Sequence, residues 1–229
     1  MRRKEYEVAE MNSEDGRKPE RPREGIYSSS RLERTITVVA ITIASIGLGY
    51  LFFTQLWWKV PPEFGCRNDF TRGGLCFFIE EESSIADDPN KLLRADIVES
   101  NPGPEIYVPI GWATQLNGIF IDNVAQPNIR WFGYVIWGTE AWIFLSMCLG
   151  LFSRLGALVA IGQSTELMLG LSNAPNEWEW SYILMVLLSI AMFGIAPGRY
   201  FGLDRLLRPR FRALSERGSR VGRLLLLFT

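Results

Sequence analysis

The chain has 229 residues, of which 48% are hydrophobic and 21% are charged, and its formal net charge is -1. It contains no histidine, which excludes bis-histidine haem, histidine-ligated copper or zinc, and a Ser-His-Asp triad in this chain. Three cysteines cannot build a Cys-only iron–sulfur cluster, and no basic excess indicates nucleic acid. The apolar residues gather in four blocks between charged segments, a pattern typical of membrane proteins.

Residues 1–33 form a polar segment in which basic and acidic side chains alternate. Pro19 and Pro22 break any long helix there, so we expect a disordered cytoplasmic tail. An arm that becomes ordered on a partner is the alternative. The segment is too long and too acidic for the first region of a signal peptide.

The first apolar block, residues 35–57, is long enough to cross a hydrocarbon core of about 30 Å. Trp57 and Trp58 at its end are typical of the aromatic belt at a membrane surface. Lys59 follows directly. We interpret it either as a cation that extends outward to the surface or as a cation at the mouth of a binding site.

Residues 58–130 form a long loop with an excess of acidic side chains. Cys66 and Cys76 flank a glycine-rich turn, and a disulfide between them is expected if the loop lies outside the cell. A free redox-active thiol pair and two inert thiols are the alternatives. Residues 106–124 are apolar but too interrupted to span, so we expect a helix that lies on the outer membrane surface.

The blocks at residues 131–151 and 155–172 form an apolar hairpin that turns at residues 152–155. Glu140 lies about nine residues inside the first arm, roughly 14 Å deep, and Glu166 lies at a similar depth in the second. An ionised carboxyl group at that depth costs on the order of 3 kcal/mol. We therefore expect both side chains to face the bundle interior, with at least one of them neutral.

The fourth block covers residues 180–196, after an acidic connection at residues 173–179. The basic C-terminal tail, residues 209–229, and Arg154 in the hairpin turn predict a cytoplasmic location for both. The predicted fold is an all-α integral membrane protein. It has four transmembrane helices in an antiparallel bundle, both termini in the cytoplasm, and a long extracytoplasmic loop that carries an interfacial helix.

Several short motifs occur in a characteristic order. They are Trp57–Gly65 after the first block, Glu140 in the second, Gly150–Leu158 across the hairpin turn, and Gly198–Asp204 after the fourth. With these motifs, residues 34–208 resemble the DoxX/DoxD family of small membrane proteins. The resemblance implies a four-helix membrane protein linked to redox and sulfur chemistry. DoxD-type members are subunits of a thiosulfate:quinone oxidoreductase and work with a DoxA-type subunit, whereas other members have no settled activity.

One hypothesis is therefore a membrane subunit that passes electrons from a sulfur compound such as thiosulfate to the quinone pool. The candidate catalytic residues are Glu140, Glu166 and Lys59, which supply protons or attract an anion. The candidate quinone-binding residues are Gln163, Trp131, Trp137 and Trp142. No metal and no covalently held cofactor is expected, and the expected partners are the lipid bilayer, quinone and a second, DoxA-like subunit in a bacterial or archaeal cytoplasmic membrane.

The alternative hypothesis is a structural or assembly subunit of a larger membrane complex without chemistry of its own. The outer loop and the tail would then be contact surfaces, and Glu140 and Glu166 a hydrogen-bonded interhelical pair. A transporter is a third hypothesis, because intramembrane carboxyl groups suit proton coupling. Four helices without an evident internal repeat argue weakly against it.

Overall fold

The computed structural model describes residues 30–67, 73–87, 111–171 and 178–229, and every regular element among them is a helix. Residues 1–29 of the predicted tail, residues 88–110 of the predicted outer loop and residues 173–177 of the acidic connection lie outside the described residues. The chain divides into two units, residues 1–37 and 38–229. The packing and the cavity described below belong to the second unit.

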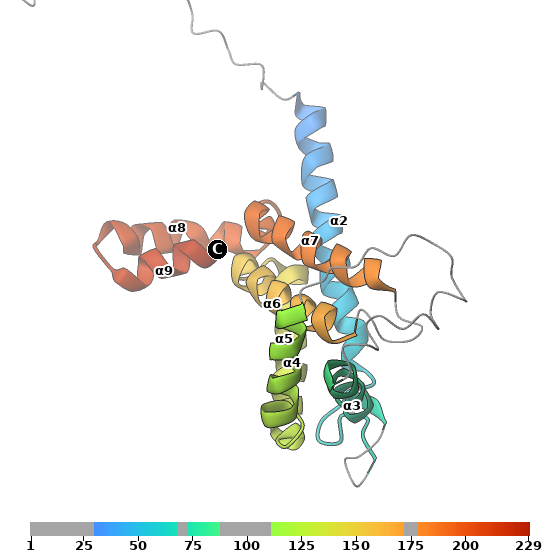
Figure 1. Cartoon of the computed structure of the whole chain (residues 1–229). Coiled ribbons are helices and arrows are strands. Elements are labelled where there is room, and N and C mark those ends of the chain that lie inside the picture. Colours follow the sequence, from blue (N-terminus) through green and yellow to red (C-terminus); the bar gives the residue numbers. More distant parts are fainter. Residues whose placement is uncertain (1–29, 68–72, 88–110, 172–177) are drawn as a thin grey trace, which may run out of the picture. The chain divides into compact units, whose positions relative to one another are not determined.

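The described helices follow the chain from α2 to α9 (Figure 1). They are α2 (Arg31–Leu56), α3 (Gly74–Asp87), α4 (Gly111–Phe120), the π-helix η2 (Ile121–Ala125), α5 (Ile129–Leu149), α6 (Ser153–Leu171), α7 (Glu179–Ile195), the 3₁₀-helix η3 (Pro197–Arg199), α8 (Leu203–Glu216) and α9 (Arg220–Phe228). The predicted interfacial helix corresponds to α4 and η2.

Three helical stretches within the described residues are long and apolar enough to cross a membrane, Arg31–Leu56, Ile129–Leu149 and Trp180–Arg199. They match the first, second and fourth predicted spans. The third predicted span forms α6, which is not among the three. Its polar run from Gln163 to Glu166 lowers its mean hydropathy, and α6 packs between α5 and α7.

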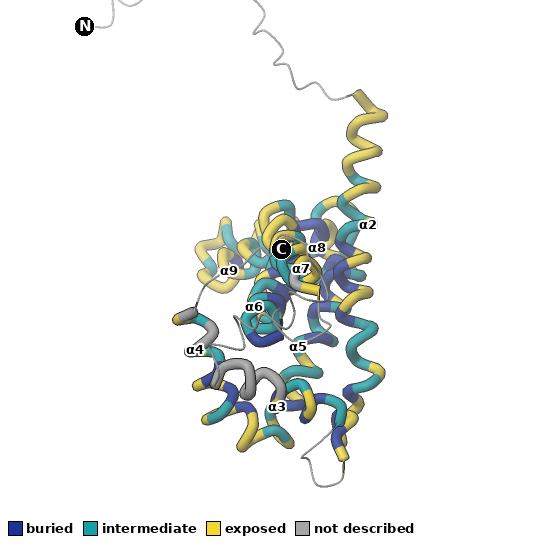
Figure 2. Tube along the Cα trace, turned by 45° about the vertical axis from the view of Figure 1, so that its right-hand side comes forward, coloured by how far each residue is buried: buried dark blue, intermediate teal, exposed yellow. Residues whose placement is uncertain are grey.

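The distribution of side chains over these helices is the reverse of that in a water-soluble bundle. Large apolar side chains are exposed on α2, α5 and α7, among them Ile43, Tyr50, Leu145, Leu184 and Leu187. Figure 2 shows the exposed residues along the first half of α2. Buried positions instead include serines and alanines, namely Ser45, Ser146, Ser153, Ser164, Ser189, Ala157 and Ala160. Small interior residues and an apolar exterior are typical of helices packed in lipid, so the chain is an all-α protein associated with a membrane.

Small residues bring α2 and α5 close together. Ser45 donates a hydrogen bond to the Met147 carbonyl across the two helices, with 2.8 Å between Oγ and O. A Cβ added at Gly49 would lie 2.8 Å from Cys148 Sγ and 3.2 Å from the Phe144 carbonyl, so a larger residue would push the two helices or their side chains apart. The crossing sets the position at which α2 ends and therefore the position of Lys59.

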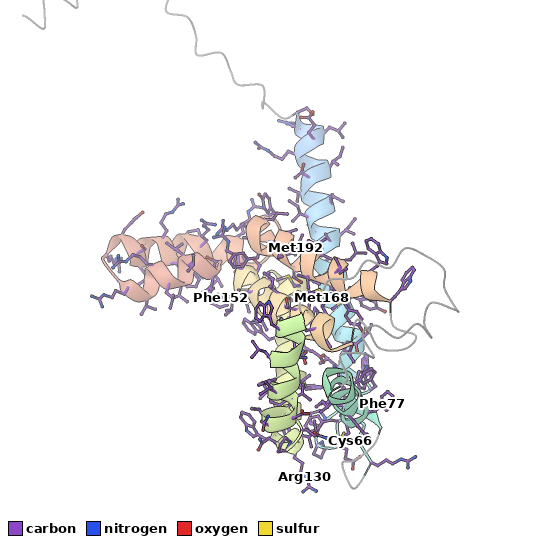
Figure 3. All side chains as sticks on the ribbon, viewed as in Figure 1. Cys66, Phe77, Arg130, Phe152, Met168 and Met192 are labelled. Carbon is purple, nitrogen blue, oxygen red and sulfur yellow. A yellow bond between two sulfur atoms is a disulfide. The ribbon has the colours of Figure 1, made fainter. Side chains whose placement is uncertain are left out.

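A second cluster of buried residues surrounds Phe64 and the disulfide between Cys66 and Cys76, whose Cα atoms are 5.5 Å apart. This pairing is the one that the sequence analysis expected. The sequence analysis did not predict α3, which begins two residues before Cys76 and carries Phe77 (Figure 3). The described part of the outer loop is therefore largely helical.

Asp204 holds the turn between α5 and α6. It is fully buried, and it accepts hydrogen bonds from the Phe152 and Ser153 backbone N–H groups at 2.7 and 2.8 Å. The Ser153 hydroxyl donates to the same carboxylate at 2.7 Å. Because these contacts satisfy the first N–H groups of α6, the helix begins at Ser153, two residues earlier than expected.

Gly150 allows this turn to approach the start of α8. Its φ is 60°, and an added Cβ would lie 2.6 Å from the Cα of Gly202. Its carbonyl accepts a hydrogen bond from the Asp204 N–H at 2.9 Å. Beyond this junction, the predicted C-terminal tail is helical: α8 and α9 pack side by side as a hairpin (Figure 1).

Asp204→Ala should destabilise the protein by about 2–3 kcal/mol, because one buried N–H group, one half-buried N–H group and a hydroxyl lose their acceptor. Thermal unfolding of the purified protein in detergent measures the effect. Arg205→Gln changes the neighbouring exposed residue and serves as the control. Equal melting temperatures for the two variants would contradict the assigned role of Asp204.

Candidate functional site

Helices α2, α3, η2, α5, α6 and α7 and the residues that follow α2 line a partly open cavity of ≈ 390 Å³. Its polar lining includes four of the predicted site residues, Lys59, Glu140, Gln163 and Glu166. Its walls are mainly aliphatic and aromatic. The volume lies within the range of about 300–1,000 Å³ that is usual for small-molecule sites.

One face of α5 lines the cavity with Phe132, Ile136 and Glu140. These residues are four positions apart, so they lie along a single stripe of the helix. Trp131 is nine positions from Glu140, which at about 100° per residue places it on the opposite face. It is 68% exposed.

None of the three predicted tryptophans lines the cavity. Trp142 is two positions beyond Glu140 and therefore points away from the lining stripe as Trp131 does. Trp137 packs against the cluster around Phe64. The aromatic lining comes from residues that the sequence analysis did not assign to the site: Phe52, Trp58, Phe78, Phe132 and Tyr182.

Lys59 and Glu140 form a buried ion pair through Nζ and Oε1, and their side chains are only 6% and 1% exposed. The two residues are 81 positions apart. Lys59 therefore turns inward from the end of α2 and does not extend to the surface. The hydrogen-bonded Glu140–Glu166 pair of the structural-subunit hypothesis is wrong, because Glu140 bonds to the Lys59 ammonium group instead.

Two further contacts position the Lys59 ammonium. Its Nζ lies 4.6 Å from the centroid of the Trp58 ring, within the distance of a cation–π interaction. The Trp58 indole in turn donates to Gln55 Oε1 at 3.1 Å. Burial lowers the pKa of Lys59, and the charges of Glu140 and Glu166 oppose that shift.

Helix α6 supplies a second group of polar atoms to the cavity. Gln163 donates from Nε2 to Glu166 Oε2 at 3.3 Å and accepts from the Thr139 hydroxyl at 3.0 Å. Because Thr139 lies on α5, this chain of contacts holds Gln163 and Glu166 in place from the neighbouring helix. The charge of Glu166 also acts on Lys59. The Lys59–Glu140 pair and the Gln163–Glu166 pair are therefore electrostatically coupled.

The second oxygen of Glu140 is the least satisfied polar atom of the site. Oε2 is buried and has no hydrogen-bond partner among the described residues. A buried acceptor without a donor costs about 1–3 kcal/mol, more when it is charged. A ligand with a hydroxyl or N–H group would remove that cost, which makes the surroundings of Glu140 the expected contact point for a bound molecule.

Comparison of this chain with protein-family models, with curated proteins and with solved structures yields no match. The resemblance to DoxX/DoxD proteins thus remains a hypothesis based on the short motifs quoted above. The chemistry of the site is argued below from its own residues.

A double-mutant cycle tests the ion pair. Lys59→Met or Glu140→Met alone should destabilise the protein by about 3–5 kcal/mol, because each leaves the other charge buried without its partner. The double variant should recover most of that loss, since it replaces both charges by apolar groups of similar size. Denaturation in detergent measures all three; strictly additive losses would show that the two side chains do not depend on each other.

Proposed function

We propose that this chain is the integral membrane subunit of a redox complex, and that its cavity binds the head group of a quinone. In this proposal the complex passes electrons from a reduced sulfur compound such as thiosulfate to the quinone pool. The observation that carries the proposal is the cavity itself: a partly open, mainly apolar space between membrane-type helices, with a buried ammonium group and two carboxyl groups.

The lining suits a flat ring that carries two oxygen atoms. Phe132, Phe52 and Tyr182 offer aromatic surfaces, and Ile136 and Leu167 offer aliphatic ones. Lys59 has three N–H donors, of which the Glu140 contact uses one. A second N–H can therefore donate to a quinone carbonyl. A quinol hydroxyl can donate to Glu140 Oε2, the atom that lacks a partner.

The reaction balances in electrons and protons. Two thiosulfate ions join through a new sulfur–sulfur bond to give tetrathionate and release two electrons. A quinone takes up those two electrons and two protons to become a quinol. This chain would supply the proton path, with Glu166 as the carboxyl group that donates and is reprotonated. The sulfur compound would react on a second, DoxA-like subunit or at the cavity mouth.

The topology is part of the proposal: four transmembrane spans, both termini in the cytoplasm, in a bacterial or archaeal cytoplasmic membrane. The disulfide between Cys66 and Cys76 supports an outer location for its loop, because disulfides persist in oxidising compartments. The arginines of α8 and α9 support a cytoplasmic location for the other end. In this arrangement α6 spans as the polar, inner helix, because its least apolar residues line the cavity.

A structural or assembly role is the second candidate. The Lys59–Glu140 pair favours it, because the pair connects the end of α2 to α5 whether or not a ligand binds. A bundle held in this way could serve as a rigid docking partner for other subunits. The two candidates differ in what a substitution at Glu166 does.

Cysteine labelling tests the topology. In a Cys148→Ala background, Ser13→Cys and Asp88→Cys each provide one free thiol, since Cys66 and Cys76 are bonded to each other. A membrane-impermeant maleimide should label Asp88→Cys in intact cells and Ser13→Cys only after permeabilisation. Labelling of both from the same side would refute the four-span arrangement.

Quinone reduction tests the proposed chemistry. Glu166→Gln keeps a hydrogen-bonding side chain but removes the ionisable proton, so quinone reduction by the purified complex should fall by about tenfold or more. The matched control is Glu80→Gln, which makes the same change at an exposed residue of α3. Melting temperatures should stay similar for both. Unchanged reduction in Glu166→Gln, or no reduction by the unmodified complex, would favour the structural role.

A further inference from the structure

The hairpin of α8 and α9 takes no part in the cavity, yet both helices are strongly amphipathic. In α8 the leucines Leu203, Leu206 and Leu214 share one face. Arg205 and Arg212 lie on the opposite face, about 180–200° from Leu203. Such a pattern is typical of a helix that lies between an apolar and an aqueous phase.

The hairpin leaves part of its apolar surface uncovered. On α9, Val221, Leu224 and Leu227 follow one another at three-residue spacing and are 63%, 55% and 55% exposed. On α8, Leu206 is 66% exposed. Among the described residues helix α9 packs mainly on α8, and this packing leaves more than half of each of these side chains exposed.

A group of arginines lies where the hairpin meets the bundle. Arg199 donates from Nε to the Thr229 carbonyl at 2.9 Å, and Arg154 Nη1 lies 3.5 Å from the Leu227 carbonyl. Both side chains thus reach the end of α9. Arg154 and Arg208 both lie within electrostatic range of Arg199.

Arg199 is already held by the oxygen of Thr229, whereas neither Arg154 nor Arg208 forms an ion pair with a side-chain carboxylate among the described residues. Asp204 is nearby, but its oxygens accept from the start of α6. The Arg154 Nε is buried and has no hydrogen-bond partner among the described residues. Like charges held together with an unused donor indicate a position for an anion.

We propose that this surface binds anionic phospholipid: the lipid phosphate lies between Arg154 and Arg208, and the stripe Val221–Leu227 enters the boundary of the acyl chains. A lipid surface supplies the anion and the apolar phase side by side. Anionic lipids are also typical of the cytoplasmic leaflet, the side on which the proposed topology places α8 and α9. The inference rests on that membrane placement and not on quinone chemistry.

Native mass spectrometry of the full chain, released from detergent with graded phosphatidylglycerol or phosphatidylcholine, measures the lipid contact. Arg154→Gln/Arg208→Gln should weaken phosphatidylglycerol binding by about thirtyfold, at roughly 1 kcal/mol per arginine. The matched control is Arg217→Gln/Arg220→Gln, which removes the same charge from exposed residues at the turn between α8 and α9 and should cost less than about threefold. Phosphatidylcholine should bind weakly to all of these forms.

Three outcomes would overturn the proposal: equal losses in the two double variants, equal binding of the two lipids, or displacement of the lipid by inorganic phosphate. Equal melting temperatures of the variants without lipid exclude a folding defect, and Arg154→Lys/Arg208→Lys, which keeps both charges, should restore most of the binding.

In nanodiscs, a bimane probe at Leu224→Cys in the Cys148→Ala background should be quenched by lipids with a spin label near the head group. A probe that is quenched only by water-soluble agents would show that the stripe does not enter the lipid, and this result would contradict the proposal.

Discussion

The buried ion pair between Lys59 and Glu140 is the interaction on which the geometry of the site depends. Removing two charges from water costs several kcal/mol per ion, and their attraction repays this only when the contact geometry is good. The structure meets that condition by fixing both partners. The close crossing at Gly49 sets the end of α2, and the Trp58 ring covers the ammonium group from one side. The pair in turn leaves one oxygen of Glu140 without a partner, which gives the cavity a defined polar contact for a ligand.

The two ends of the bundle differ in chemistry. At one end of α5, the disulfide and the cluster around Phe64 close the cavity with α3 and η2. At the other end, Asp204 fixes the α5–α6 turn, and its oxygens accept from the start of α6, whereas Arg154 and Arg208 have no side-chain carboxylate partner among the described residues. In the proposed topology the first end lies outside and can meet a sulfur compound or a second subunit. The second lies at the cytoplasmic surface, where anionic lipids neutralise the arginines.

Much of the fold could be predicted from hydropathy and charge, because length and apolar content are local properties of the sequence. Three helices match the predicted spans. Glu140 is buried in the interior, as expected from the free-energy cost of a charged carboxyl group in lipid. The partner of Glu140 could not be predicted, since it depends on which residue of a distant segment the α2–α5 crossing brings near. Helix α3 was missed because its short apolar start lies in a loop rich in charge, and its packing depends on the disulfide.

The aromatic lining shows how helical periodicity could have been used further. Spacing from Glu140 selects Phe132 and excludes Trp131 and Trp142, which the sequence analysis had chosen by residue type. Phe78 and Tyr182 come from other helices, and no pattern within α5 or α6 indicates them. The amphipathic character of α8 and α9 was also present in the sequence, but the density of arginines favoured the simpler prediction of a basic tail.

The central claim is that the cavity beside Lys59 and Glu140 holds a quinone. Photolabelling of the membrane-embedded protein with an azidoquinone, followed by peptide mapping, tests it most directly. The account predicts labels on the lining residues of α5 and α6, such as Phe132, Ile136 and Leu167, and their loss when excess unmodified quinone competes. Labels confined to exposed apolar residues such as Leu184 and Leu187, unchanged by competition, would contradict it.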